Sequence, residues 1–278
     1  IPAAGIALSA LAIGLLAVVT WRRKDHRTRP ELSDTPLRVA GLSKSFGGEV
    51  HAVTNASFSV PKGVVVGLLG PNGAGKTTTM RMIVGLIHPT SGESYIFGDS
   101  VHPGSAALAR VGCFIEGPGL LPHLSGRENL RLYWDSSGRQ GSDPHLDEVL
   151  AIAGLGSSID RKVRTYSQGM RQRLGIAQAM LGLPDLLILD EPTNGLDPPQ
   201  IIEMRQVLRD YAATGRTILV SSHLLSEVQQ TCTEVVVMNH GVVLAQASVD
   251  DLVRGRQGMS LEDVFMEIVG YGHEVVTE

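Results

Sequence analysis

The apolar residues of this chain follow two patterns, which predict strands and helices in a mixed fold. Apolar and polar residues alternate over 37–42 and 56–60, which predicts two strands with a turn at Gly47-Gly48 between them. The apolar runs 64–69 and 186–189 predict fully buried strands of a parallel sheet. These strand patterns predict an α/β core.

Helical patterns dominate the stretch from about residue 111 to residue 183. Ser125 and Glu128 have the spacing of a capping box that opens a helix. Further helices are expected after Asp147 and over 168–181. The sequence thus predicts a helical insertion in the α/β core. The other expected elements are strands over 91–97, 217–220, 235–238 and 242–245, and helices over 78–85, 104–110 and 261–269, with one more helix after Asp197-Pro198.

The first 21 residues form a separate apolar segment. Residues 1–21 carry no charge, and a helix of this length crosses a hydrocarbon core of roughly 30 Å at about 1.5 Å per residue. We therefore expect a single N-terminal membrane helix. Trp21 and the basic residues Arg22-Arg23-Lys24 predict that its C-terminal end faces the cytoplasm. A polar linker is expected over 22–36.

Two other interpretations of the apolar segment stay open. A secretory signal peptide normally carries its positive charges before the apolar core, whereas here they follow it. A buried core helix normally has a second, polar face. The chain starts with Ile1 and not with Met, so the segment is also compatible with the last helix of a longer protein.

The composition is that of an ordinary folded protein. Hydrophobic residues make up 43% and charged residues 19% of the 278 residues. A net charge of −4 gives no global basic surface for nucleic acid, and an aromatic content of 4% argues against a base-stacking platform. Cys113 and Cys232 lie far apart in no metal-type spacing, which indicates reduced thiols in a cytosolic environment.

Residues 70–77 read Gly-Pro-Asn-Gly-Ala-Gly-Lys-Thr, a complete G-x-x-x-x-G-K-[ST] phosphate loop between an expected strand and an expected helix. Its glycines let backbone N–H groups point at phosphate oxygens, and the positive end of the helix adds to that field. Lys76 is expected to reach the β- and γ-phosphates, and the Thr77 hydroxyl to ligate Mg²⁺. A glycine-rich turn that binds nothing is the weaker alternative. The expected nucleotide contacts are Gly70, Pro71, Asn72, Gly73, Ala74, Gly75, Lys76, Thr77 and Thr78.

Two further segments carry candidate chemistry. Asp190 and Glu191 follow the apolar run 186–189, where Asp190 is expected to hold Mg²⁺ and Glu191 to polarise the attacking water. Residues 166–173 form a loop that ends in a helix N-terminus, with a hydroxyl and a glycine N–H. Such a helix start is a second phosphate-binding device or, equally, a simple helix cap.

Taken together, these motifs resemble those of the ATP-binding cassette (ABC) transporter ATPases. The resemblance covers about residues 37–271 and leaves a tail over 272–278. It implies a P-loop NTPase core with an N-terminal antiparallel β subdomain and the helical insertion. The motifs that match in order are Gly70–Thr77, Tyr166–Met170, Leu186–Glu191, Gly195-Leu196-Asp197 and Ser221-Ser222-His223.

Within that family, the chain is similar to the bacterial subgroup that serves drug, antibiotic-peptide and lipid exporters. The stretches that carry this likeness are Tyr166–Arg173, Ser125–Leu130 and Ser260–Phe265. The resemblance implies an ATP-hydrolysing subunit that works with Mg²⁺ and a membrane permease at the cytoplasmic face of the membrane.

The resemblance also implies roles for matching residues. Glu191 is expected to be the general base, and His223 to contact the γ-phosphate and hold that base in place. Ser167 and Gly169 are expected to bind the γ-phosphate of ATP held by a second copy, so that two copies close head to tail. Asp197 is expected at the seam of that dimer.

Four positions need separate comment. Phe46 stands where the family places an aromatic that stacks on adenine, although a core strand residue is the alternative. Gln168 and Met170 differ from the family's commoner Ser-Gly-Gly-Gln signature, while Ser167 and Gly169 remain. Glu116 stands where the family has a glutamine that touches Mg²⁺ and couples to the permease; an ionised carboxylate can ligate Mg²⁺ but donates no hydrogen bond.

Two other functions compete with a transport ATPase. A soluble cassette ATPase that acts on DNA or ribosomes usually carries two cassettes, a coiled-coil insertion or a zinc insertion, and the sequence contains none of these. A regulatory sensor that binds nucleotide without hydrolysing it would not need Glu191 and His223. We therefore expect no nucleic-acid partner.

Overall fold

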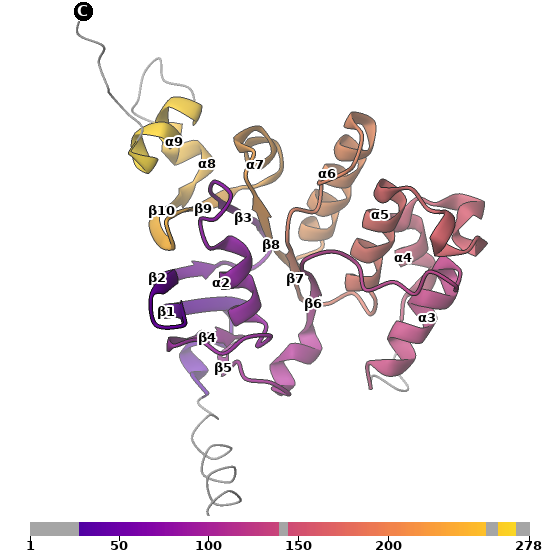
Figure 1. Ribbon diagram of the computed structural model, residues 1–278, viewed down its shortest axis with the longest axis horizontal. Coiled ribbons are helices and arrows are strands. Elements are labelled where there is room, and N and C mark those ends of the chain that lie inside the picture. The colour runs from indigo at the N-terminus through magenta and orange to yellow at the C-terminus, as the bar shows by residue number, and fades with distance from the viewer. Residues whose placement is uncertain (1–27, 139–143, 254–260, 271–278) are drawn as a thin grey trace, which may run out of the picture.

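The structure is a computed structural model that describes residues 28–138, 144–253 and 261–270 (Figure 1). Two β-sheets form its framework. In Figure 1, strands β1 and β2 lie with helix α2 on one side of the larger sheet, and helices α3, α4 and α5 lie beyond strands β6 and β7 on the other.

The larger sheet has six strands in the order β10-β9-β3-β8-β7-β6. Strands β3, β6, β7, β8 and β9 are parallel to their neighbours, and β10 adds an antiparallel edge. The loops after the parallel strands therefore meet at one edge of the sheet. The strand bounds are β3 (Val65–Leu69), β6 (Val111–Phe114), β7 (Leu186–Leu189), β8 (Thr217–Ser222), β9 (Glu234–Asn239) and β10 (Val242–Ser248).

Both faces of this sheet are covered, which explains the uninterrupted apolar runs. Val66 and Leu68 of β3 pack into one buried cluster with residues of β1, β2 and α2. Val65 and Leu69 of the same strand point to the opposite face and join a second cluster with α5 and α6. The prediction of buried parallel strands is confirmed for β3 and β7.

The smaller sheet is antiparallel, in the order β2-β1-β4-β5. Its first two strands are longer than the alternating pattern predicted. The pairing of β1 with β2 shifts register at three places between Val39 and Ser45, and each shift interrupts the two-residue alternation. The bounds are β1 (Leu37–Phe46), β2 (Val50–Val60), β4 (Ser91–Ile96) and β5 (Asp99–Ser100).

The helices begin close to the expected residues. The Ser125–Glu128 capping box is present, with the Glu128 N–H donating to the Ser125 hydroxyl over 3.2 Å and the Ser125 N–H donating to the Glu128 carboxylate over 2.7 Å. The helix expected over 104–110 is only a 3-10 turn, Ala106–Arg110. The α-helices are α2 (Lys76–Ile83), α3 (Gly126–Ser136), α4 (Leu146–Ala153), α5 (Gln168–Ala179), α6 (Pro198–Ala213), α7 (Leu225–Thr231), α8 (Val249–Val253) and α9 (Leu261–Val269).

The stretch expected to be a helical insertion begins with a strand of the core. Strand β6 pairs in parallel with β7, and α5 packs closely against it. A Cβ atom at Gly112 of β6 would lie 1.9 Å from the carbonyl oxygen of Ala179, so only glycine fits there. The helices α3 and α4 then extend away from the sheet (Figure 1).

The predicted membrane helix over residues 1–21 lies outside the described residues and stays a prediction. Within residues 28–138, 144–253 and 261–270, no helix combines the length and apolar character that a membrane crossing requires. The described part of the expected linker contains a short 3-10 helix, Pro30–Leu32.

Candidate active site

The phosphate loop connects β3 to α2, as its sequence predicted. Gly75 has φ +96°, a conformation that strains any residue with a Cβ atom, and it precedes the first residue of α2. Gly70 lies so close to β9 that a Cβ atom would come within 2.2 Å of the Met238 carbonyl oxygen. The loop therefore needs glycine at both positions for its shape and its close packing.

Lys76 stands at the first turn of α2 with only 6% of its surface exposed. Its ammonium donates hydrogen bonds to the carbonyl oxygens of Gly70 (2.7 Å) and Pro71 (3.2 Å) and lies 3.6 Å from a Glu191 carboxylate oxygen. Burial lowers the pKa of Lys76, and the charges of Glu191 and Asp190 oppose that shift. The site thus holds a desolvated cation at the centre of the loop.

A cavity of about 450 Å³ opens in front of this lysine. The phosphate loop from Asn72 to Thr78 forms one wall, and Glu191 and His223 form another. Residues Val50, His51 and Ala52 of β2 and residue Asn194 complete the lining. The cavity therefore joins the N-terminus of α2 to both predicted catalytic residues.

Thr77 and Asp190 lie together, as expected of residues that hold a metal. The Thr77 hydroxyl donates to one Asp190 oxygen over 2.8 Å, and the Ser221 hydroxyl donates to the other over 2.5 Å. Asp190 is buried, with 8% of its surface exposed. In nucleotide sites Mg²⁺ takes most of its ligands from phosphate and water and only a few oxygens from the protein. The Thr77 hydroxyl and the Asp190 carboxylate would supply such oxygens, so these residues fit the ion.

Glu191 and His223 meet at the end of the sheet, although 32 residues separate them. The His223 ring nitrogen Nδ1 lies 2.9 Å from a Glu191 carboxylate oxygen that can accept its hydrogen. The Glu191 backbone has φ +49°, which a residue with a Cβ atom adopts only when its surroundings hold it there. The chain therefore turns directly after β7 at Glu191, the residue expected to be the general base.

Two side chains that the sequence analysis did not assign hold this turn. The Ser221 hydroxyl accepts the Glu191 N–H over 2.9 Å. The Gln172 amide on α5 donates to the carbonyl oxygens of both Glu191 and Pro192 at 3.1 Å. Ser221 stood in a matched motif and Gln172 in the stretch 166–173, but neither side chain was assigned a role from the sequence.

Glu116 stands apart from the residues that line the cavity. It follows β6 with φ +64° and forms an ion pair with Arg81 of α2. Its side chain is 53% exposed. The carboxylate therefore has a cationic partner in this structure, and its expected contact with Mg²⁺ stays a prediction.

Ser167, Gly169 and Asp197 form a second group outside the described lining of the cavity. Ser167 caps α5 by accepting the Met170 N–H over 3.2 Å, and Asp197 caps α6 by accepting the Gln200 N–H over 3.0 Å. The two helix starts adjoin, since a Cβ atom at Gly169 would lie 2.8 Å from the Gln200 amide oxygen. Both cap interpretations are confirmed, and the phosphate contact stays a prediction.

Phe46 ends β1 at the tip of the hairpin with β2. It pairs with Val50, which lines the cavity, and 46% of its surface is exposed. The Lys44 ammonium lies 5.1 Å from the centre of its ring. The alternative of a buried core residue is therefore wrong, and the expected stacking on adenine stays a prediction.

Comparison with known proteins identifies the family. The sequence model described as "ABC transporter" matches residues 53–194, just over half of the chain, and includes the phosphate loop and Glu191. The chain belongs to the ABC transporter family. ATP is the nucleotide of that family, so this chain is an ATP-binding ATPase subunit.

Relatives and solved structures agree with this assignment. The bacitracin transport ATP-binding protein BcrA of Bacillus licheniformis is 43% identical over 78% of this chain and 71% of its own length. The lantibiotic transport ATP-binding protein SrtF of Streptococcus pyogenes is 39% identical over 77% of this chain and 91% of its own. A solved structure described as the ATP-binding subunit of an ABC transporter is 32% identical, with a TM-score of 0.76 over 84% of this chain and 99% of its own.

Proposed function

We propose that this ABC ATPase powers the export of a drug, an antibiotic peptide or a lipid-like substrate through a membrane permease. The proposal rests on relatives that transport bacitracin and lantibiotics. We place the subunit at the cytoplasmic face of the membrane, bound to the permease. The predicted apolar helix over 1–21 is one means of attachment, and the permease contact is another.

The observation that carries hydrolysis is the convergence of Lys76, Glu191 and His223 on one cavity. We assign Lys76 to the β- and γ-phosphates, where its charge and the N-terminus of α2 oppose the phosphate charge. Glu191 then accepts the proton of the attacking water, and His223 holds the Glu191 carboxylate in position. Bound Mg²⁺ would neutralise phosphate charge, with Thr77 and Asp190 as its protein ligands.

The cavity supplies only half of a phosphate cage. Ser167 and Gly169 belong to a separate helix start, which can offer a phosphate the Ser167 O–H as a donor and the positive end of a helix dipole. We propose that these residues complete the site of a second copy in a head-to-tail dimer, with Asp197 at the seam. Two ATP molecules would then lie between the two copies.

We propose that Glu116 passes the state of the site to the permease. Its ion pair joins the loop after β6 to α2, the helix that begins in the phosphate loop. A movement of α2 on nucleotide binding would therefore displace Arg81 and, through the ion pair, Glu116.

Glu191→Gln tests the assignment of the base. The amide keeps the size of the side chain but cannot accept the proton, so we expect ATP hydrolysis to fall by about 100-fold or more. ATP binding should persist, and the variant should accumulate as an ATP-bound dimer in size-exclusion chromatography. Glu203→Gln, an exposed carboxylate on α6, is the matched control and should hydrolyse ATP normally. Hydrolysis at the wild-type rate in Glu191→Gln would refute Glu191 as the base.

A further inference from the structure

Strand β8 ends in two serines that face opposite sides of the sheet and make parallel sets of hydrogen bonds. The Ser221 hydroxyl donates to Asp190 and accepts the Glu191 N–H. The Ser222 hydroxyl donates to Glu227 over 2.9 Å and accepts the Leu224 N–H over 3.0 Å. Each serine thus links a buried carboxylate to the backbone of a loop that carries a catalytic residue.

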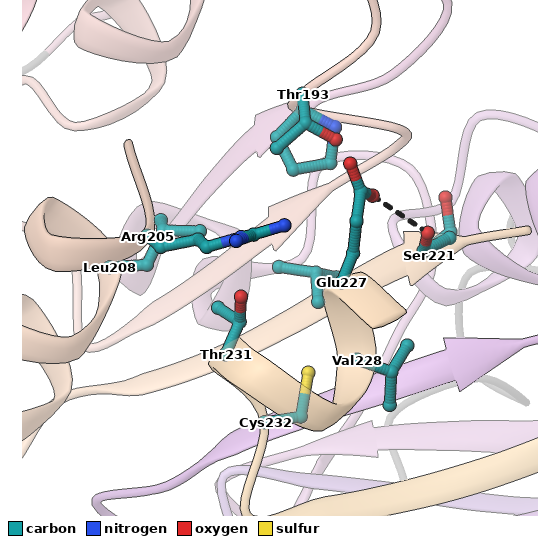
Figure 2. A pocket seen from close by; sticks show the side chains of 11 residues that line it. Thr193, Arg205, Leu208, Ser221, Glu227, Val228, Thr231 and Cys232 are labelled. Atoms are coloured by element: carbon teal, nitrogen blue, oxygen red, sulfur yellow. Dashed lines mark hydrogen bonds between the residues drawn. The ribbon is translucent and has the colours of Figure 1, made fainter. Parts of the chain in front are cut away.

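Glu227 is a buried carboxylate without an assigned role. It lies in the first turn of α7 with 8% of its surface exposed. Figure 2 shows its carboxylate beneath Thr193, at a small cavity between α6, α7 and the end of β8, and marks the hydrogen bond that it accepts from Ser222. Burying a carboxylate is costly, so its presence here calls for a specific partner.

Arg205 of α6 lies at the same small cavity as Glu227. Its guanidinium extends toward the same cavity in Figure 2, and its Nε is the one buried side-chain polar atom without a hydrogen-bond partner among the described residues. Its charge faces the cavity that Glu227 also lines, and the Glu227 carboxylate accepts the hydrogen bond from Ser222.

The Glu227 carboxylate sets the direction of the Ser222 hydroxyl. The Glu227 carboxylate oxygen lies closer to the Ser222 hydroxyl (2.9 Å) than the Leu224 carbonyl oxygen does (3.3 Å), so the single hydroxyl hydrogen points to Glu227 and leaves a lone pair for the Leu224 N–H. Ser222 and Leu224 flank His223 on both sides. The pair therefore closes the turn that presents the His223 ring to Glu191.

We propose that Glu227 is a positioning residue for ATP hydrolysis, which holds the His223 turn against Glu191 through the Ser222 hydroxyl. The inference rests on the proposed role of His223 in the reaction. It adds a buried support, reached through α7, to a catalytic pair that otherwise lies partly exposed at the cavity.

Three substitutions test the chain of contacts. Glu227→Leu removes the acceptor, and Ser222→Ala removes the hydroxyl in a smaller change that guards against a folding failure. We expect each to lower kcat by about tenfold, the effect of one misplaced hydrogen-bonded group, while KM for ATP stays within about twofold. Glu227→Gln keeps an oxygen that can accept from Ser222 and should restore most of kcat.

A packing control separates positioning from stability. Val228→Ala truncates the neighbouring buried residue of α7 without touching a hydrogen bond. It should lower the melting temperature and leave kcat unchanged. If Val228→Ala lowers kcat as much as Glu227→Leu does, Glu227 acts through helix stability and the proposal is overturned.

A double substitution tests whether the effect passes through His223. In a His223→Ala background, Glu227→Leu should cause no further loss of kcat, because the positioned group is already absent. If the losses of kcat from His223→Ala and Glu227→Leu multiply in the double variant, the inference about Glu227 is overturned and the proposed role of His223 still stands. If His223→Ala itself leaves kcat unchanged, the failure lies with the proposed role of His223 and takes this inference with it.

Discussion

At the scale of single residues, the site is organised around the charge of one buried lysine. Lys76 is buried and has a lowered pKa, with the carboxylates of Asp190 and Glu191 beside it. A phosphate group offers the same cation a stronger partner than either carbonyl oxygen that it now contacts. We therefore expect a bound triphosphate to compensate for the burial of the Lys76 charge.

Lys76→Ala should accordingly weaken ATP binding. Loss of one charge-assisted contact raises the dissociation constant for ATP by about 10- to 100-fold. Titration of the purified chain with ATP in a calorimeter measures the change. Lys62→Ala, an exposed lysine in the turn before β3, is the control and should bind ATP like the unsubstituted chain. An unchanged dissociation constant in Lys76→Ala would contradict the assignment of Lys76 to the phosphates.

The sequence predicted the residues of the site that belong to one continuous motif. Gly70–Thr77 and Asp190-Glu191 are local motifs, and the structure places them as expected. Ser222 and Glu227 were not predicted as a pair, and Gln172 was not predicted at all. Their partners depend on which side of β8 or α5 meets the turn, and this follows from packing rather than from spacing.

At the scale of elements, the insertion depends on how α3 begins. The Ser125–Glu128 capping box satisfies two N–H groups that would otherwise lack a partner at the start of that helix. Ser125→Ala should lower the free energy of unfolding by about 1 kcal/mol in denaturant titration. ATP affinity should not change, because α3 does not line the described nucleotide cavity.

Ser136→Ala provides the matched control at the other end of α3. Its hydroxyl donates to the Tyr133 carbonyl oxygen from an exposed position. Its loss should change the free energy of unfolding by less than about 0.5 kcal/mol. Equal effects of the two serine substitutions would argue that the capping box contributes nothing specific.

The bounds of an element were predictable where its residues alternate or stay buried throughout, and they were not predictable where that burial pattern is interrupted. Strand β7 is buried on both faces, and its bounds agree with its apolar run. Strand β1 changes register against β2, so only its first six residues alternated clearly enough to be predicted. Strand β8 continues through Ser221 and Ser222, which are polar but buried because each has hydrogen-bond partners.

At the scale of the whole molecule, the phosphate loop and the helix start at Ser167 and Gly169, the two expected phosphate-binding devices, lie on different parts of the fold. The phosphate loop starts α2 beside the smaller sheet, whereas Ser167 and Gly169 start α5, whose far end packs on β6 (Figure 1). The sequence predicted both devices but could not place them relative to each other. That placement depends on the order β3-β8-β7-β6, which separates the strands that precede them.

The separation makes the head-to-tail dimer testable by mixing two inactive chains. Lys76→Ala breaks the phosphate loop and leaves Ser167 and Gly169 intact. Gly169→Asp places a negative charge at the helix start, where a Cβ atom would lie 2.8 Å from the Gln200 amide oxygen and 3.3 Å from the Gly195 carbonyl oxygen. It leaves the phosphate loop intact. Each chain alone should be almost inactive. A mixed dimer with twofold-related sites contains one site with both halves intact, so mixing should restore up to about a quarter of the wild-type ATPase rate.

The control is a mixture of two chains that both carry Lys76→Ala, one of them also carrying Gly169→Asp, in which neither of the two sites can be complete. Restored activity in this control would show exchange or contamination rather than complementation. Co-purification of differently tagged Lys76→Ala and Gly169→Asp chains in the presence of ATP would demonstrate that mixed dimers form. If these mixed dimers still show only the sum of the two separate rates, neither chain completes the site of the other. In that case Ser167 and Gly169 are helix caps alone, and the nucleotide is held by the phosphate loop side of the fold without them.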